Sequence, residues 1–139
     1  MLQRLDETPR KRQLGEGALN TLAQLAARGY VLGLVTNRRS DEMDAAYQGH
    51  RLEEYFAFTV TATEAGAPKP GRAIFDLALA RSGCAAGDAI HVGDNLYADI
   101  AGAEGAGIRP ILIDPKGIFP EATCMVIRTL PELLARLDG

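Results

Sequence analysis

The chain has 139 residues, enough for one domain with a single buried core. Apolar residues make up 47% of it and charged residues 24%, which is ordinary for a globular protein. The net charge of −3 and the lack of an apolar run of about 18 residues argue against nucleic-acid and membrane partners. The polar start of the chain lacks the apolar stretch of a secretory signal, and the two cysteines form no metal-ligand pattern. We therefore expect a cytoplasmic protein with free thiols.

Helical and strand patterns alternate from residue 16 onward. Apolar residues at helical spacing predict a first helix that Gly29 ends, and the apolar run over 30–35 predicts a buried parallel strand. The later elements are a helix over 41–47 capped by Ser40, a helical piece over 52–56, a strand over 58–61, a helix over 72–82, a strand over 89–92, a helix over 97–106, strands over 110–113 and 125–127, and a helix over 131–137.

This alternation over short loops predicts an α/β fold, a three-layer Rossmann-like parallel sheet with helices on both faces. We expect residues 15–139 to form that core domain and residues 1–14 to be loosely ordered.

Polar residues follow the predicted strands, where ligands bind in such sheets. Individually, they have plain explanations: a helix entry, a surface lysine, or a helix N-cap. Their order along the chain, each at a strand's carboxyl end, is much more specific. They are Thr36 and Asn37 after the strand over 30–35, Lys69 in a proline-flanked turn over 67–71, and Gly93, Asp94, Asn95 and Asp99 after the strand over 89–92.

These groups fit a site for phosphate and magnesium. A threonine hydroxyl and the amides of the following turn can hold phosphate oxygens, and Lys69 offsets their charge. Asp94 supplies the hard oxygen ligand that Mg²⁺ prefers, and Gly93 lets the backbone approach closely. Asp99 either binds a metal-bound water or orients Lys69.

Three runs resemble the second, third and fourth motifs of haloacid dehalogenase (HAD) superfamily hydrolases, closest to the phosphoglycolate-phosphatase-like branch, over residues 15–114. They are Leu34-Val35-Thr36-Asn37; Ala67-Pro68-Lys69-Pro70 with Ile74-Phe75; and His91-Val92-Gly93-Asp94-Asn95 with Asp99.

The resemblance implies a catalytic set of Lys69, Asp94 and Asp99, with Mg²⁺ held by the two aspartates. It also implies that Thr36 contacts the transferring phosphoryl group and Lys69 stabilises it. We predict that Asn37 and Asn95 help to bind the substrate.

One departure concerns the first motif, an apolar strand ending in Asp-x-Asp-Gly-Thr, whose first aspartate is the nucleophile. The nearest string is Arg4-Leu5-Asp6-Glu7-Thr8, which places Arg4 at the nucleophile position. The other interpretation is a linker that would follow a cap domain. We therefore expect a HAD-like core without the usual first strand and without a cap. The exposed strand edges would then close together or accept a strand from a second chain, giving a homodimer with or without exchanged elements.

The leading hypothesis is a magnesium-dependent hydrolase of small phosphoesters, weak and broad in specificity because nucleophile and cap are missing. It would use a metal-activated water or a substitute carboxylate such as Asp6, Asp41 or Asp114. The alternative is a non-catalytic phosphate-binding or assembly module, a remnant or one part of a split protein.

The sequence also suggests positions for other residues near the predicted site. We expect His91 to be packed and Tyr97 to lie in the core rather than at the mouth of the site. Glu64 is at least as readily a surface charge as a site residue, and His50 is expected to be exposed. Arg38 and Arg39 are expected to face either an anionic substrate or solvent.

Overall fold

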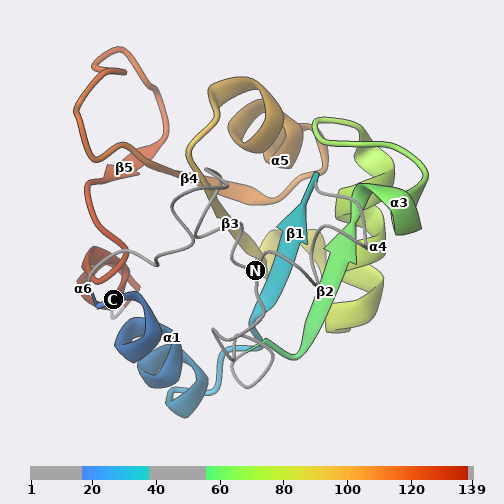
Figure 1. The fold of residues 1–139 in the computed structure, drawn as a ribbon, viewed down its shortest axis with the longest axis horizontal. Helices are drawn as coiled ribbons and strands as arrows, with labels where there is room; N and C mark the ends of the chain where they lie inside the picture. Colours follow the sequence, from blue (N-terminus) through green and yellow to red (C-terminus); the bar gives the residue numbers. More distant parts are fainter. Residues whose placement is uncertain (1–16, 38–55, 138–139) are drawn as a thin grey trace.

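The computed structural model describes residues 17–37 and 56–137, in which parallel strands lie between helices (Figure 1). The strand β1 (Gly33–Thr36) pairs with β2 (Phe58–Thr61), and β3 (Ile90–Gly93) pairs with β4 (Arg109–Ile113), which pairs with β5 (Met125–Ile127). All of these pairings are parallel. The predicted α/β fold, a parallel sheet with helices, is confirmed.

Helices connect the strands and cover them. In chain order they are α1 (Ala18–Ala27), α3 (Ala62–Ala65), α4 (Arg72–Ser82), the 3₁₀-helix η3 (Ala86–Asp88), the π-helix η4 (Leu96–Ala101), α5 (Gly102–Gly105) and α6 (Glu132–Arg136). Glycine ends two of them, because Gly29 after α1 and Gly83 after α4 both have positive φ, where glycine carries no steric penalty. None of the helices in the described ranges is long and apolar enough to cross a membrane.

The strands contribute to two hydrophobic clusters, one on each face. Successive residues of a strand point to opposite faces, so Leu34 joins one cluster and Val35 the other. The first cluster includes Leu22 and Leu25 from α1 and Leu133 from α6. The second consists of residues from β1, β2, α4, α5 and the adjoining loops, among them Val35, Val60, Ile74, Phe75, Ala78 and Ala103. The sheet is therefore the middle of three layers.

Two predicted elements are wrong, one in its extent and the other in its helix type. The strand expected over 30–35 begins only at Gly33, and Tyr30 and Val31 are 40% and 52% exposed. The physical reason is that Tyr30 still belongs to the end of α1: its backbone N–H bonds to Leu25 O, and its hydroxyl donates to Leu137 O. The helix expected over 97–106 is instead η4 followed by the single turn α5, as described below.

Both cysteines are free, as expected. Several predictions lie outside the described residues: the loosely ordered segment over 1–14, the missing first strand, the helix over 41–47 with its cap Ser40, most of the helical piece over 52–56, and the interpretations of Asp6, Arg38, Arg39, Asp41 and His50.

Candidate active site at the carboxyl ends of β1 and β3

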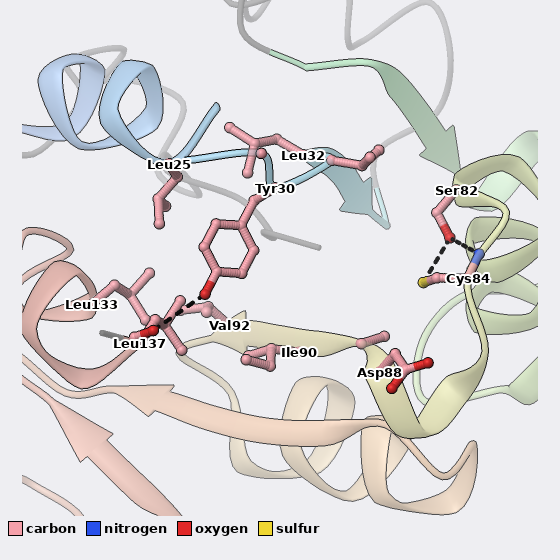
Figure 2. A pocket seen from close by; sticks show the side chains of 13 residues that line it. Leu25, Tyr30, Leu32, Ser82, Cys84, Asp88, Ile90, Val92, Leu133 and Leu137 are labelled. Carbon is pink, nitrogen blue, oxygen red and sulfur yellow. Dashed lines mark hydrogen bonds between the residues drawn. The ribbon is translucent and has the colours of Figure 1, made fainter. Parts of the chain in front are cut away.

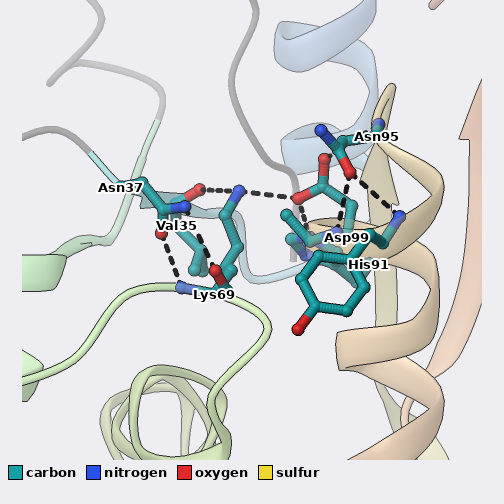
Figure 3. A network of polar contacts seen from close by, with 8 residues as sticks. Val35, Asn37, Lys69, His91, Asn95 and Asp99 are labelled. Carbon is teal, nitrogen blue, oxygen red and sulfur yellow. Dashed lines mark hydrogen bonds and ion pairs between the residues drawn. The ribbon is translucent and has the colours of Figure 1, made fainter.

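Lys69 lies between the ends of two strands that are distant in sequence (Figure 3). Its ammonium Nζ donates to the backbone oxygen of Val35, near the end of β1, at 3.3 Å. The same atom is 2.6 Å from Asp99 Oδ1, in the helix that follows β3. The Lys69 side chain is only 1% exposed. The structure thus brings together two predicted site residues that are 30 positions apart.

Asn37 holds the backbone of Lys69 in place. Its side-chain oxygen accepts from Lys69 N at 2.6 Å, and its Nδ2 donates to Lys69 O at 3.4 Å. Both backbone hydrogen-bonding groups of the lysine are therefore tied to the residue that follows β1. The substrate-binding role expected for Asn37 stays a prediction, and fixing the lysine is a function that the sequence did not indicate.

Asn95 is the N-cap of the π-helix η4. Its side-chain oxygen accepts from the backbone N–H groups of Tyr97 and Ala98, at 2.9 and 2.8 Å. Its backbone oxygen accepts from Asp99 N at 2.9 Å and from Ile100 N at 3.2 Å, the second being the five-residue spacing of a π-turn. Asn95, not Asp94, is thus the N-cap, and its amide NH₂ is the group left for its predicted contact with substrate.

The expected core position of Tyr97 is wrong, since its side chain is 72% exposed. Residues two positions apart on a helix do not share a face, so an inward Asp99 requires an outward Tyr97. Asp99 is 0% exposed.

Asp99 accepts three hydrogen bonds. Its Oδ1 contacts Lys69 Nζ and His91 Nε2, the latter at 3.1 Å, and its Oδ2 accepts from Asn95 N at 3.2 Å. Burial raises the pKa of Asp99, but the His91 hydrogen bond and the Lys69 charge outweigh it and hold that pKa well below its usual range. Burial lowers the pKa of His91 to about 4 despite the opposing effect of Asp99. At neutral pH the cluster is a carboxylate between an ammonium and a neutral imidazole.

Gly93 ends β3 directly beneath this carboxylate. A Cβ atom on Gly93 would overlap the Cβ, Cγ and Oδ2 atoms of Asp99. The close backbone approach expected at Gly93 is therefore required for Asp99 to reach Lys69.

We predict that Gly93→Ala lowers the free energy of unfolding by about 1–3 kcal/mol, the usual effect of overpacking a core. Urea denaturation measures it. Gly87→Ala is the matched control, because nothing lies within 4 Å of a Cβ there, and it should change stability by no more than about 0.5 kcal/mol. Equal stabilities for the two variants would contradict the close approach.

Thr36 and Asp94 stand at the two strand ends that flank this cluster. Thr36 is the last residue of β1 and is buried, whereas Asp94 directly follows β3 and is exposed. The six predicted site residues are therefore in two groups: Asn37, Lys69, Asn95 and Asp99 are joined by hydrogen bonds, and Thr36 and Asp94 adjoin them in the chain.

Two other carboxylates have structural roles. Both oxygens of Asp114 accept backbone N–H groups, from Ile118 and Phe119 at 3.0 Å each, so it closes a loop and is a poor substitute nucleophile. Glu64 forms a capping box with Thr61 and an ion pair with Arg81 at 2.9 Å, which holds its pKa below the usual value. Glu64 is thus a surface charge, one of the two roles considered for it.

The described side chains offer few ligands for a magnesium ion. Within residues 17–37 and 56–137, no group of three or more His, Cys, Asp or Glu side chains could hold a metal ion. Asp94 offers one exposed carboxylate, and Mg²⁺ is commonly bound through one or two carboxylates while keeping several waters and substrate phosphate oxygens. The described residues fit a sparsely coordinated magnesium ion.

The prediction that His91 is packed is confirmed, because its side chain is 0% exposed. Its hydrogen bond with Asp99 was not predicted. The available signal was its position: it alternates with Val92 and precedes the site by a few residues, which places it on the face that Asp99 also reaches.

Comparisons with known proteins identify the family of the chain. Residues 3–113 match the family model described as haloacid dehalogenase-like hydrolase. The chain belongs to this family.

Its relatives include several phosphatases. It is 37% identical over 98 residues to a ribulose-1,5-bisphosphate 5-phosphatase of Halopiger xanaduensis, covering 70% of this chain and 41% of that protein. It is 36% identical over 100 residues to a phosphoserine phosphatase of Thermus thermophilus, covering 72% and 40%. The chain thus spans well under two thirds of the length of these curated relatives.

Solved structures share the fold. A HAD phosphatase from Thermococcus onnurineus superposes with a TM-score of 0.86 at 31% identity, covering 94% of this chain and 62% of that one. A 2-haloacid dehalogenase from Pseudomonas syringae pv. Tomato gives a TM-score of 0.76 at 37% identity, covering 89% and 54%. The family therefore includes both phosphate-ester and carbon–halogen chemistry among the proteins similar to this chain.

Proposed function

We propose that the protein is a phosphatase that hydrolyses small phosphoesters with the help of Mg²⁺. The observation that carries the proposal is the buried Lys69–Asp99 pair, which fixes a positive charge between the carboxyl ends of β1 and β3. Ligands of parallel α/β sheets bind at that edge, and phosphoryl transfer depends mainly on positioning and on compensating negative charge. The phosphatases among its relatives support the same substrate class.

Four of the six predicted site residues have a role in this proposal. Asp94 would hold the magnesium ion, which when bound supplies positive charge to the phosphate oxygens. Lys69 compensates the charge of the phosphoryl group from the opposite strand end, and Thr36 contacts that group. The three hydrogen bonds that Asp99 already accepts favour its role of orienting Lys69 over direct metal binding.

None of these residues is proposed as the nucleophile. The described residues provide no enclosing surface that would select the alcohol part of the substrate, and on this basis we propose slow turnover and broad specificity.

Hydrolysis of a chromogenic phosphomonoester tests the proposal. We expect turnover with magnesium, none with chelator, and a loss of turnover in Asp94→Ala. Asp76→Ala is the matched control, because Asp76 is an exposed aspartate of α4 that forms a solvent-exposed ion pair with Arg72. Halide release from a 2-haloacid without phosphatase turnover would instead assign the chemistry of the dehalogenase relative. Equal background rates in wild type and Asp94→Ala would overturn the proposal that the protein is an enzyme.

The alternative is an assembly module, and one observation favours it. A cavity of about 240 Å³ lies beside the segment before β1, the start of β3 and the end of α6, and its mainly apolar lining includes Leu32, Ile90 and Val92 (Figure 2). Among the described residues, these two strands pair on one edge only. A strand supplied by a second copy would pair those edges and bury apolar surface.

Light scattering tests the homodimer proposed on this basis. A molar mass that stays at twice the chain mass over a hundredfold dilution range supports the exchanged dimer. A monomer at every concentration contradicts it.

A further inference from the structure

His91 occupies a place where an apolar residue would normally lie. It is in the middle of β3, is 0% exposed, and projects from the opposite face to Val92. The edge of its ring meets the Phe75 ring of α4, with centroids 5.0 Å apart and planes at 89°. An aromatic or aliphatic side chain would satisfy this packing equally well, so the imidazole needs a reason beyond packing.

The hydrogen bonds determine the tautomer of His91. The Asp99 carboxylate is ionised and can only accept, so the ring nitrogen that contacts it, Nε2, carries the hydrogen. A neutral imidazole has one N–H, which leaves Nδ1 as a bare acceptor. Nδ1 is the one buried side-chain polar atom in the described ranges that lacks a hydrogen-bond partner. Burying an unsatisfied acceptor is unfavourable, and the contact with Asp99 is what offsets it.

That contact constrains the ion pair. Asp99 Oδ1 is shared by Lys69 and His91, and Oδ2 is held by the backbone of Asn95 (Figure 3). Donors on both oxygens prevent the carboxylate from rotating about its Cβ–Cγ bond. Without His91, the hydrogen bond to Asp99 Oδ1 among the described residues would come from Lys69 alone, the group whose position the carboxylate is meant to set.

We propose that His91 is a positioning residue, which through its Nε2–H group holds the Asp99 carboxylate so that Lys69 stays between the ends of β1 and β3. Its relevance to turnover rests on the proposed phosphatase function. The proposed positioning of Asp99 and Lys69 by His91 does not rest on that function, because the orientation of the Lys69 ammonium can be measured without substrate.

Three variants separate positioning from packing. His91→Gln places an amide N–H near the position of Nε2, whereas His91→Leu keeps the volume and removes the donor. Val92→Ala is the control for general core damage, because Val92 is a buried neighbour that points to the other face of the sheet. Two readouts are needed: the ¹⁵N resonance of the Lys69 ammonium, assigned with Lys69→Met, and kcat and KM for a chromogenic phosphomonoester.

We expect His91→Leu to shift or broaden the Lys69 ammonium signal and to lower kcat by about 10- to 100-fold with little change in KM, as for other groups that orient a charged partner. His91→Gln should retain the signal and most of kcat. Val92→Ala should lower stability without moving the signal.

The wild-type protein provides a test that requires no variant to fold. The chain has only two histidines, so His50→Gln assigns the imidazole ¹⁵N signals of His91. An Nε2–H tautomer supports the proposal, and an Nδ1–H tautomer overturns it, as does an unchanged Lys69 signal in His91→Leu. If wild type has no turnover, the proposed function fails while the NMR readouts still decide the role of His91.

Discussion

Replacing Lys69 by methionine is expected to lower the free energy of unfolding by about 3–5 kcal/mol, the usual effect of removing one partner of a buried ion pair. The Asp99 side chain is 0% exposed, so the remaining carboxylate would be buried with no cation beside it. Urea denaturation at pH 7 measures the change. Turnover should fall by about 10²–10³-fold, because the variant also lacks the charge that offsets the phosphoryl group.

The double variant Lys69→Met with Asp99→Leu separates the two contributions. Removing both charges should restore part of the lost stability but none of the turnover, because an apolar pair can replace a buried ion pair while His91 and Asn95 lose their acceptor. Arg72→Met is the control, since it breaks an exposed ion pair with Asp76 and should cost less than about 1 kcal/mol. If Lys69→Met were as mild as Arg72→Met, the buried pair would contribute nothing to the fold.

Stability is expected to decrease on acidification from about pH 6.5 to about pH 4 because of His91. Its pKa falls from 6.5 to about 4 on folding, so in this range the unfolded chain binds the proton and the folded chain does not. The contribution is complete above pH 6.5, is lost as the pH falls, and amounts to about 3 kcal/mol.

Stability curves between pH 4 and 8 check this expectation. His91→Leu should flatten the curve between pH 5 and 6.5, whereas His50→Gln should not. Asp99 acts with the same sign at lower pH, because its lowered pKa makes stability decrease below the usual carboxylate range. A His91→Leu curve parallel to wild type down to pH 5 would contradict the neutral buried imidazole.

The elements with a strong local pattern were predictable from sequence. The strand over 58–61, the helix over 72–82 and the strand over 125–127 have the expected bounds. Each is set by nearby residues, such as Gly83 after α4. The prediction that the strand begins at Tyr30 is wrong because an apolar side chain can contact the end of a helix as well as a sheet. The contact of Tyr30 with Leu137, which is distant in sequence, decides between these two positions.

The candidate site was predictable as a set of residues but not as a network. The rule that ligands bind at strand ends was enough to single out Lys69 and Asp99. The contacts of Asn37 with Lys69 and of His91 with Asp99 depend on distances between separate segments, which a local pattern does not encode. Tyr97 was misplaced because the π-turn that fixes the inward position of Asp99 has no clear sequence signal.

The clamp formed by Asn37 has a consequence for engineering the protein. Asn37 bonds both backbone groups of Lys69 across 32 positions, so the turn before α4 is anchored to the sheet rather than to the helix that follows it. The ammonium group bonds to Val35 O and Asp99 Oδ1, whereas Arg72 and Asp76 lie on the solvent-facing side of α4 and pair with each other. Fluorescent labels or surface-charge changes can be introduced there without displacing the lysine.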